Sequence, residues 1–431
     1  MARVGSHAGK ARSGKRPSRA QERERLLARA AEVTVDERYD VAVIGGGAAG
    51  LAAAISSAEA GAKTLVLESA PECGRSILAT GNGRCNFSTV ELGAERFNDP
   101  EFVGQAFGDD PLGDILNFFR DSNMRWALED GRLYPLSRRA ASVRNVLLRR
   151  AREAGATLAP ARPVTSVERD GKSFSLAFEQ LFDEGRKTRT RAGRVVVATG
   201  GGAAEALGPL GLEVTETRKV LCPIACEDSP LAALDGCRAQ VRAQLSHGMF
   251  PCWSERGEVL FRSYGLSGIV IFNMSREVLA GDLVAIDLVP DVNVSELRQM
   301  IDPFMHGDFE DGCVDGVVDP KIASVLGSLA RSGWQGPSAE DPTDESASER
   351  LIGLLKGLPF RTLGTTDASS AQVTRGGLKN DQFDATTLEA LRIPGLFACG
   401  ETLDVDGACG GYNLSWAWKS GMVAGSAAAQ A

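Results

Sequence analysis

The order of apolar and polar positions from Tyr39 onward predicts a strand, a tight turn, a helix and a second strand. The segment YDVAVIGGGAAGLAAAISSAEAGAKTLVLE has two apolar runs, separated by a glycine-rich turn and a stretch of small residues. Short apolar runs bounded by turn residues are typical of buried strands. The segment is therefore interpreted as a βαβ unit. RVVVA at residues 194–198 predicts another buried strand, and PVTSVERDGKSFSLAFE predicts two alternating strands around a DG turn.

The middle of the chain has a different pattern. Residues 206 to about 290 alternate in short segments (CRAQVRAQLSH, GEVLFRSY, GIVIFNM and DLVAIDLVP) with turn residues between them, as in a small antiparallel barrel. Helices are predicted next at 294–304, 320–331 and 348–356. The chain then returns to a buried strand (GLFACGE), a glycine loop (DVDGACGGYN) and a final helix of small residues.

These elements predict an α/β fold: a Rossmann-like dinucleotide-binding domain with an inserted antiparallel β-barrel and a small helical subdomain. Four parts are expected. They are a disordered basic tail (1–36), a discontinuous nucleotide domain (37–205 and 357–431), the barrel (206–292 plus strands near 362–376) and a helical insertion (293–356).

Charge and composition limit the protein classes. The net charge is −8, although the first 30 residues carry +7, so nucleic-acid binding is not expected apart from this basic tail. A short helix is possible at 21–32. Nine cysteines without a CxxC pair, and an N-terminus without a secretory apolar region, favour a cytoplasmic protein with reduced thiols. No segment is apolar enough for a membrane span. There are only three histidines, which restricts histidine catalysis.

The glycine-rich turn carries the first chemical motif. Gly45, Gly47 and Gly50 form GxGxxG between a predicted strand and a predicted helix. The first glycine permits the turn, the second lets a diphosphate approach the helix N-terminus, and the third allows close packing. Glu68 ends the next strand, where a carboxylate can accept hydrogen bonds from ribose hydroxyls. This motif predicts dinucleotide binding but does not separate NAD from FAD.

The far end of the chain favours FAD. Glu401 ends a predicted strand and can bind a ribityl chain, while Gly410 and Gly411 let backbone approach a ligand before a helix begins near Asn413. A helix N-terminus stabilises the negative charge that develops on a flavin on reduction. The alternative is a turn before a core helix, because Leu414, Ala417, Trp418 and Gly421 also make a plain packing face.

At these residues the sequence resembles the BaiN/YhiN-like flavoproteins, a family of aminoacetone oxidase family FAD-binding enzymes and NAD(P)/FAD-dependent oxidoreductases. The resemblance spans residues 40–425. Its most specific segments are GRSILATGNGRCNFS at 74–88 and GLFACGETLDVDGACGGYNLSWAWKSG at 395–421. It implies an FAD domain built from both ends of the chain, and a barrel and helices that cover the flavin and shape a substrate cavity. It also implies that residues 81–86 form a loop near the isoalloxazine ring.

The resemblance implies a set of cofactor contacts. They are Gly45, Gly47, Ala48, Ala49, Gly50, Glu68, Arg75, Gly81, Arg84, Cys85, Asn86, Thr199, Gly200, Gly400, Glu401, Gly411, Tyr412 and Asn413. The chain departs from the family pattern at Ser76, where relatives usually have lysine. It also has a shortened stretch after ATGG and an isoleucine, Ile269, where relatives usually have proline.

A flavin supplies hydride chemistry itself, so the protein must bind, orient and shield it. Tyr264 and Tyr412 are candidate proton donors, although buried packing is the alternative for each. Arg84 can bind an acidic substrate group or the flavin, or can hold loop carbonyls. Cys85 and Cys409 can form a redox pair or be plain buried thiols. No cysteine spacing matches a zinc site, so no metal is predicted.

The predicted function is that of an FAD-dependent oxidoreductase. The enzyme takes hydride from NADH or NADPH, which visits the flavin transiently, and passes it to a small or medium unsaturated, enone-like organic substrate. The family resemblance suggests substrates such as oxidised bile acids. One alternative is an amine or aminoketone oxidase that uses O2. An alternative of another class is a flavin-binding redox sensor or RNA-associated protein without turnover. The sequence leaves the oligomeric state open.

Overall fold

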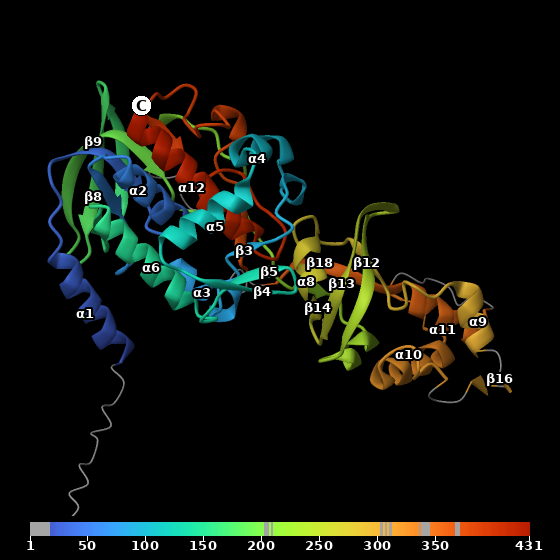
Figure 1. The fold of residues 1–431 in the computed structure, drawn as a ribbon. Coiled ribbons are helices and arrows are strands. Elements are labelled where there is room, and N and C mark those ends of the chain that lie inside the picture. Colours follow the sequence, from blue (N-terminus) through green and yellow to red (C-terminus); the bar gives the residue numbers. More distant parts are fainter. Residues whose placement is uncertain are drawn as a thin grey trace, which may run out of the picture.

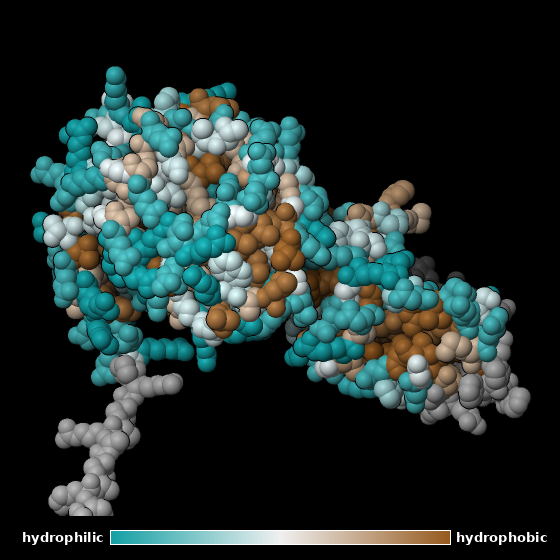
Figure 2. Space-filling model, viewed as in Figure 1, coloured by the Kyte–Doolittle hydropathy of each residue, from teal (hydrophilic) through white to brown (hydrophobic). Residues whose placement is uncertain are grey.

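A computed structural model describes residues 18–201, 207, 210–301, 305–306, 308–309, 313–334, 336–337, 345–366 and 371–431. The chain forms two lobes that meet over a narrower neck (Figures 1 and 2). The sheet lobe contains the seven-stranded sheet and its helices, and the barrel lobe contains a closed barrel with α8–α11 (Figure 1).

The sheet of the first lobe has the order β6-β2-β1-β9-β8-β7, and β20 also pairs with β9. β6, β2, β1, β9 and β20 are parallel, while β8 and β7 are antiparallel additions. The bounds are β1 Arg38–Ile44, β2 Thr64–Leu67, β6 Thr157–Ala159, β7 Val164–Asp170, β8 Ser173–Gln180, β9 Arg186–Val197 and β20 Leu396–Ala398. The predicted βαβ unit and the DG hairpin are therefore present.

Two helices distant in sequence pack closely on this sheet. They are α2 (Ala48–Glu59) and α12 (Tyr412–Gln430). A Cβ on Gly421 would lie 2.4 Å from the Ala49 carbonyl oxygen, and one on Gly425 would lie 2.2 Å from the Ala53 carbonyl oxygen. The small residues of both helices therefore serve close backbone packing. From the first contact to the second, the residue number rises by four in both helices, so the two helices run parallel.

Further elements complete the sheet lobe, and some of them pack against α12. They are α3 Arg75–Ala79, η1 Thr80–Gly83, η2 Ala94–Arg96, α4 Pro100–Phe107, α5 Pro111–Asp121, α6 Ala140–Glu153, and a three-stranded sheet of β3 Ser88–Thr89, β5 Arg132–Pro135 and β4 Trp126–Glu129. The Trp418 indole nitrogen donates to the Phe87 carbonyl at 3.0 Å, and the Ser88 and Ser415 hydroxyls lie 2.9 Å apart. The final helix is therefore fixed to residues more than 320 positions earlier.

The barrel closes in the order β11-β14-β13-β12-β15-β18. The strands are β11 Ile224–Cys226, β12 Arg238–His247, β13 Phe250–Arg262, β14 Gly265–Ser267, β15 Leu283–Asp287 and β18 Leu358–Thr365. A two-stranded ribbon of β10 (Arg218–Val220) and β19 (Val373–Arg375) lies outside the barrel. The α/β fold with an inserted antiparallel barrel is therefore confirmed.

One predicted barrel strand is wrong. The segment GIVIFNM forms the helix α8 (Ile269–Met274), which begins after Gly268 at φ +102°. A Cβ on Gly268 would lie 2.5 Å from the Glu258 carbonyl oxygen, so the chain turns here against β13. Short apolar runs do not distinguish a buried strand from a buried helix by periodicity, which explains the error.

The three predicted helices of the insertion are present as α9 (Val294–Ile301), α10 (Pro320–Ser332) and α11 (Ala347–Lys356). They lie at the end of the barrel lobe farthest from the sheet lobe (Figure 1). Near the N-terminus, α1 (Arg19–Ala31) begins with a capping box between Ser18 and Gln21. The expectation of disorder through residue 36 is thus wrong for this segment, and the first seventeen residues of the basic tail lie outside the described part.

Candidate functional site

The glycine turn between β1 and α2 is built as the motif predicts. Gly45 has φ +103°, and a Cβ there would lie 2.3 Å from the Ala198 carbonyl oxygen. A Cβ on Gly50 would lie 1.9 Å from the Gly45 carbonyl oxygen. Gly47 precedes α2 and makes no side-chain cap, so the first N–H groups of the helix face outward for an anion.

Other predicted residues follow the carboxyl ends of the parallel strands. Ala198 N donates to the Ile44 carbonyl at 2.8 Å, and Cys399 N donates to the Val197 carbonyl at 3.0 Å, so these strand ends form one edge. Thr199 and Gly200 follow β9, and Gly400 and Glu401 follow β20. Ligands of open α/β sheets bind at this edge.

Glu68 is held at the end of β2. Its Oε2 accepts from Gly46 N and its Oε1 accepts from Ala70 N, each at 2.6 Å. A carboxylate has about four lone-pair sites, so both oxygens can still accept from hydroxyl groups. The position therefore suits the ribose contact expected from the sequence.

The N-terminus of α12 forms a second cradle at the same edge. Gly410 and Gly411 have positive φ angles of 130° and 106°. A Cβ on Gly411 would lie 2.8 Å from the Ser88 carbonyl oxygen and 3.0 Å from Asn86 Oδ1. Asn86 Oδ1 is buried and has no hydrogen-bond partner among the described residues. A buried acceptor without a donor costs free energy, so this atom fits a ligand that carries an N–H group.

The two helix N-termini are staggered. Gly421 of α12 faces Ala49 near the start of α2, so the N-terminus of α12 projects eight residues beyond the N-terminus of α2, against their shared N-to-C direction. At about 1.5 Å per residue this is about 12 Å. Two positive helix ends at this spacing, with Asn86 Oδ1 at the far one, suit an elongated dinucleotide such as FAD.

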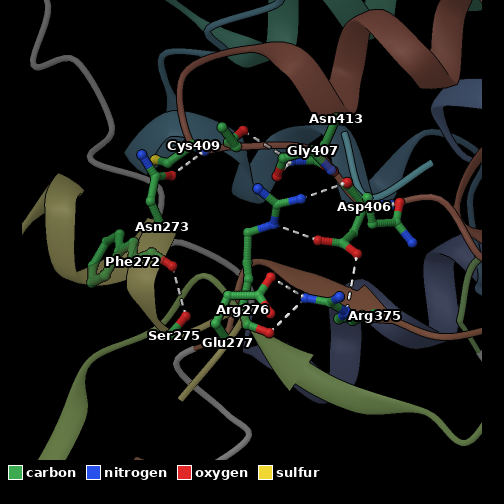
Figure 3. Close-up of polar contacts among 12 residues, drawn as sticks. Phe272, Asn273, Ser275, Arg276, Glu277, Arg375, Asp406, Gly407, Cys409 and Asn413 are labelled. Carbon is green, nitrogen blue, oxygen red and sulfur yellow. Dashed lines mark hydrogen bonds and ion pairs between the residues drawn. The ribbon is translucent and has the colours of Figure 1, made fainter. Parts of the chain in front are cut away.

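The remaining predicted residues occupy different surroundings. Asn413 braces the glycine loop, because its Oδ1 accepts from Gly407 N and its Nδ2 donates to the Gly407 carbonyl, both at 2.8 Å (Figure 3). Arg84 forms an ion pair with Glu129 and lies 4.5 Å above the Tyr134 ring, which favours its structural role. Arg75 is exposed, and within the described part of the chain its side chain has no hydrogen bond or ion pair.

Neither thiol near the site is poised for redox chemistry. Burial raises the pKa of Cys85 to about 11, and burial likewise raises the pKa of Cys409. A protonated thiol is a poor nucleophile, so the geometry favours plain thiols over a redox pair. No cluster of metal-ligating side chains occurs among the described residues.

The two predicted tyrosines lie apart. Tyr412 is buried, with its ring 6.2 Å from that of Phe97, and burial raises the pKa of its hydroxyl. Tyr264 lies in the turn between β13 and β14, is 43% exposed, and has Arg262 over its ring. Its carbonyl accepts from Cys226 N of β11. Both contacts of Tyr264 lie within the barrel lobe.

Sequence reasoning missed a group of polar residues around Cys409. Asn273 of α8 accepts from Cys409 N at 2.7 Å and donates to Glu255 of β13 at 2.8 Å. Arg132 Nε of β5 lies 3.7 Å from the position of a Cβ on Gly410. The lone asparagine within the apolar run GIVIFNM was the available signal. The contact between Asn273 and Cys409 brings the barrel and sheet lobes together at one loop (Figure 3).

An ion-pair network lies below this group. Arg276 Nε donates to Asp406 Oδ2 at 2.5 Å, and Arg375 Nε lies 3.6 Å from Asp406 Oδ1. Arg375 also donates to Glu277 at 2.7 Å (Figure 3). The Asp406 side chain is fully buried. The glycine loop is thus joined to the end of α8 by a charged contact.

Burial raises the pKa of Glu401 to about 7, and Asp406 adds to this, while the Thr374 N–H and Lys219 oppose it. The folded, flavin-free protein therefore keeps a proton that the unfolded chain has lost between about pH 4.5 and 7, so its stability falls as pH rises through this window.

We expect Glu401→Gln to remove this dependence and to stabilise the flavin-free protein at pH 8 by up to about 3 kcal/mol. Urea unfolding at pH 5 and 8, with the exposed Glu101→Gln as control, measures this; an unchanged pH slope contradicts it.

The strand edge, the glycine turn and the two helix ends define a dinucleotide-binding α/β protein. The family described as HI0933-like protein Rossmann domain matches residues 39–427, and the chain belongs to this family. It is an FAD-dependent oxidoreductase, and the resemblance to BaiN/YhiN-like flavoproteins is confirmed.

Several known proteins are similar to it. The 3-dehydro-bile acid delta(4,6)-reductase of Clostridium scindens is 30% identical over 90% of this chain and 99% of that protein. The ribosomal RNA dihydrouridine synthase of Escherichia coli is 27% identical over 89% of this chain and 96% of that protein. The crystal structure of 3-ketosteroid-delta4-(5alpha)-dehydrogenase from Rhodococcus jostii has 18% identity and a TM-score of 0.47, and covers 93% of this chain and 99% of that chain. Within the described residues, no helix has the length and apolarity that crossing a bilayer requires.

Proposed function

We propose that this enzyme takes hydride from NADH or NADPH and saturates a C=C bond conjugated with a carbonyl group in a small or medium-sized organic substrate. The observation that carries the proposal is the second cradle. There the N-terminus of α12, Asn86 Oδ1 and the polar residues around Cys409 meet at the glycine loop. The names of the two relatives support it. A 3-oxo-Δ4,6 acid and uridine both contain a C=C bond conjugated with a carbonyl, and reduction saturates it in each.

The cofactor contacts are part of this proposal. They are Gly45, Gly47, Ala48, Ala49, Gly50, Glu68, Arg75, Gly81, Arg84, Cys85, Asn86, Thr199, Gly200, Gly400, Glu401, Gly411, Tyr412 and Asn413. Bound FAD supplies the hydride-transfer chemistry. The free N–H groups of α2 hold the diphosphate, and Glu68 accepts from ribose hydroxyls. Asn86 Oδ1 accepts from an N–H of the ring system, and the N-terminus of α12 stabilises negative charge there.

The nicotinamide cofactor binds transiently in this proposal. The sequence has one complete GxGxxG motif, at Gly45–Gly50, and the proposal assigns it to FAD. A nicotinamide therefore has to approach the exposed side of the glycine loop and leave before the substrate binds. Arg132 is the cation placed to meet the carbonyl oxygen of that substrate, where negative charge develops during conjugate reduction.

An anaerobic acceptor screen tests the proposal. Purified protein is reduced with NADH or NADPH, and its flavin absorbance is followed after addition of a 3-oxo-4-ene steroid, uridine-containing RNA or O2. In a separate arm, an amine is added to the oxidised protein. We expect reduction by a nicotinamide and re-oxidation by a conjugated C=C acceptor. Re-oxidation by O2 alone, with reduction by amines, would favour the oxidase alternative. No re-oxidation by any organic acceptor would favour the redox sensor.

A further inference from the structure

Glu255 is an acidic side chain of the barrel lobe near the glycine loop. It lies on β13 and is half-buried. Its Oε1 accepts a hydrogen bond from Asn273 Nδ2 at 2.8 Å, and Asn273 Oδ1 accepts from Cys409 N at 2.7 Å. Cys409 directly precedes Gly410 and Gly411, which begin α12. One asparagine thus joins the carboxyl group to the loop of the proposed flavin site.

The hydrogen-bond directions determine which oxygen can hold a proton. The Cys409 backbone N–H can only donate, so Asn273 must turn its carbonyl oxygen toward it. The amide nitrogen of Asn273 therefore faces Glu255, and Oε1 must be an acceptor. No donor among the described residues reaches Oε2 of Glu255. Oε2 is the oxygen on which a proton fits and from which it can be delivered.

Two cations lie near enough to Glu255 to affect the pKa of its carboxyl group. Burial raises the pKa of its carboxyl group, whereas the Asn273 hydrogen bond and the cations Arg96 of η2 and Arg276 after α8 oppose this. Glu255 in turn contributes to the raised pKa of Cys409. The net upward direction of the pKa means that the group keeps its proton at higher pH than an exposed glutamate, as a general acid requires.

We propose that Glu255 is the proton donor of this oxidoreductase, held by Asn273 over the glycine loop at the N-terminus of α12. This inference rests on the proposed reduction of a conjugated C=C bond. Asn273 is a positioning residue. It keeps Oε1 occupied, so that Oε2 faces the substrate.

The step balances. Hydride, supplied through the cofactor by a nicotinamide that is oxidised, adds to the β-carbon, and the π electron pair moves toward the carbonyl oxygen. The proton on Glu255 Oε2 then adds to the α-carbon, which leaves the saturated product and a Glu255 carboxylate. The carboxylate regains its proton from solvent. One hydride and one proton are thus added across the C=C bond.

The test is Glu255→Gln, which keeps an acceptor for Asn273 and removes the acidic proton. We expect reduction of the flavin by the nicotinamide to be unchanged and re-oxidation by a conjugated C=C acceptor to slow by about 10²- to 10⁴-fold. In the wild type we expect the re-oxidation rate to fall at high pH, as Glu255 loses its proton, and in Glu255→Gln we expect this fall to be absent. Glu258→Gln, three residues along the same strand in a surface pair with Arg238, is the matched control and should keep the wild-type rate.

A second measurement does not depend on turnover. Infrared difference spectra of wild-type and Glu255→Gln protein should show one protonated carboxyl that titrates above about 4.3, the usual pKa of glutamate. Wild-type re-oxidation in Glu255→Gln, or no such carboxyl, would overturn the assignment and leave the proposed function intact. A wild-type enzyme that no conjugated C=C acceptor re-oxidises would overturn the proposed function itself.

Discussion

Purified protein with Gly50→Val should be colourless. A Cβ at this position would lie 1.9 Å from the Gly45 carbonyl oxygen, so the side chain separates α2 from the turn that precedes it. The N–H groups of α2 then no longer face the diphosphate. A loss of about 3 kcal/mol of binding free energy is roughly 100-fold in Kd, enough to lose the flavin during purification.

The absorbance spectrum of the purified variant and the flavin released on boiling measure this result. Gly353→Ala in α11 is the control, because a Cβ there meets nothing within 4 Å, and this variant should remain yellow. Circular dichroism separates loss of flavin from loss of fold, and Gly50→Ala introduces the same Cβ clash without the two further methyl groups of valine. A folded, yellow Gly50→Val protein would contradict the role of this turn.

The second large effect is expected from Arg276→Ala. This change leaves the buried Asp406 carboxylate without its 2.5 Å partner, and Arg375 at 3.6 Å compensates only in part (Figure 3). Removing one member of a buried ion pair costs about 3–5 kcal/mol, because the remaining charge stays desolvated. We therefore expect destabilisation by about 3 kcal/mol and weaker binding of flavin, since Asp406 lies in the glycine loop.

Urea unfolding of flavin-free protein at pH 7 measures the change. Arg238→Ala is the control, because its pair with Glu258 is exposed and such pairs contribute about 0–1 kcal/mol. A destabilisation by Arg276→Ala no larger than that of Arg238→Ala would show that the contact between the lobes is not held by this pair.

The fold was predictable where its signal is local. The strand, turn and helix around Gly45 follow from apolar periodicity and glycine spacing, which the structure reproduces in β1 and α2. The segment that forms α8 was mistaken for a strand, because a short apolar run carries no period that separates the two. The helix at Arg19–Ala31 contradicts the disorder expected for this part of the tail but agrees with the short helix considered at 21–32, and Ser18 and Gln21 form its capping box.

The residues of the site were likewise predictable only where their signal is local. The glycines and Glu68 stand in a contiguous motif, so their juxtaposition is readable from spacing. Glu255, Asn273 and Arg132 meet the glycine loop only through tertiary structure, as the sequence separation of 136 positions from Asn273 to Cys409 illustrates. No pattern along the chain encodes such a meeting.

The parallel packing of α2 against α12 also sets the order of events during synthesis. The glycine turn is made early in synthesis, but it packs against Ala198 after β9, and the other end of the site needs Gly411 and the helix that follows. A nascent chain that still lacks this helix exposes the small-residue face of α2 and has nowhere to retain the flavin. Any truncation that removes α12 should therefore yield apoprotein that cannot be rescued by added FAD.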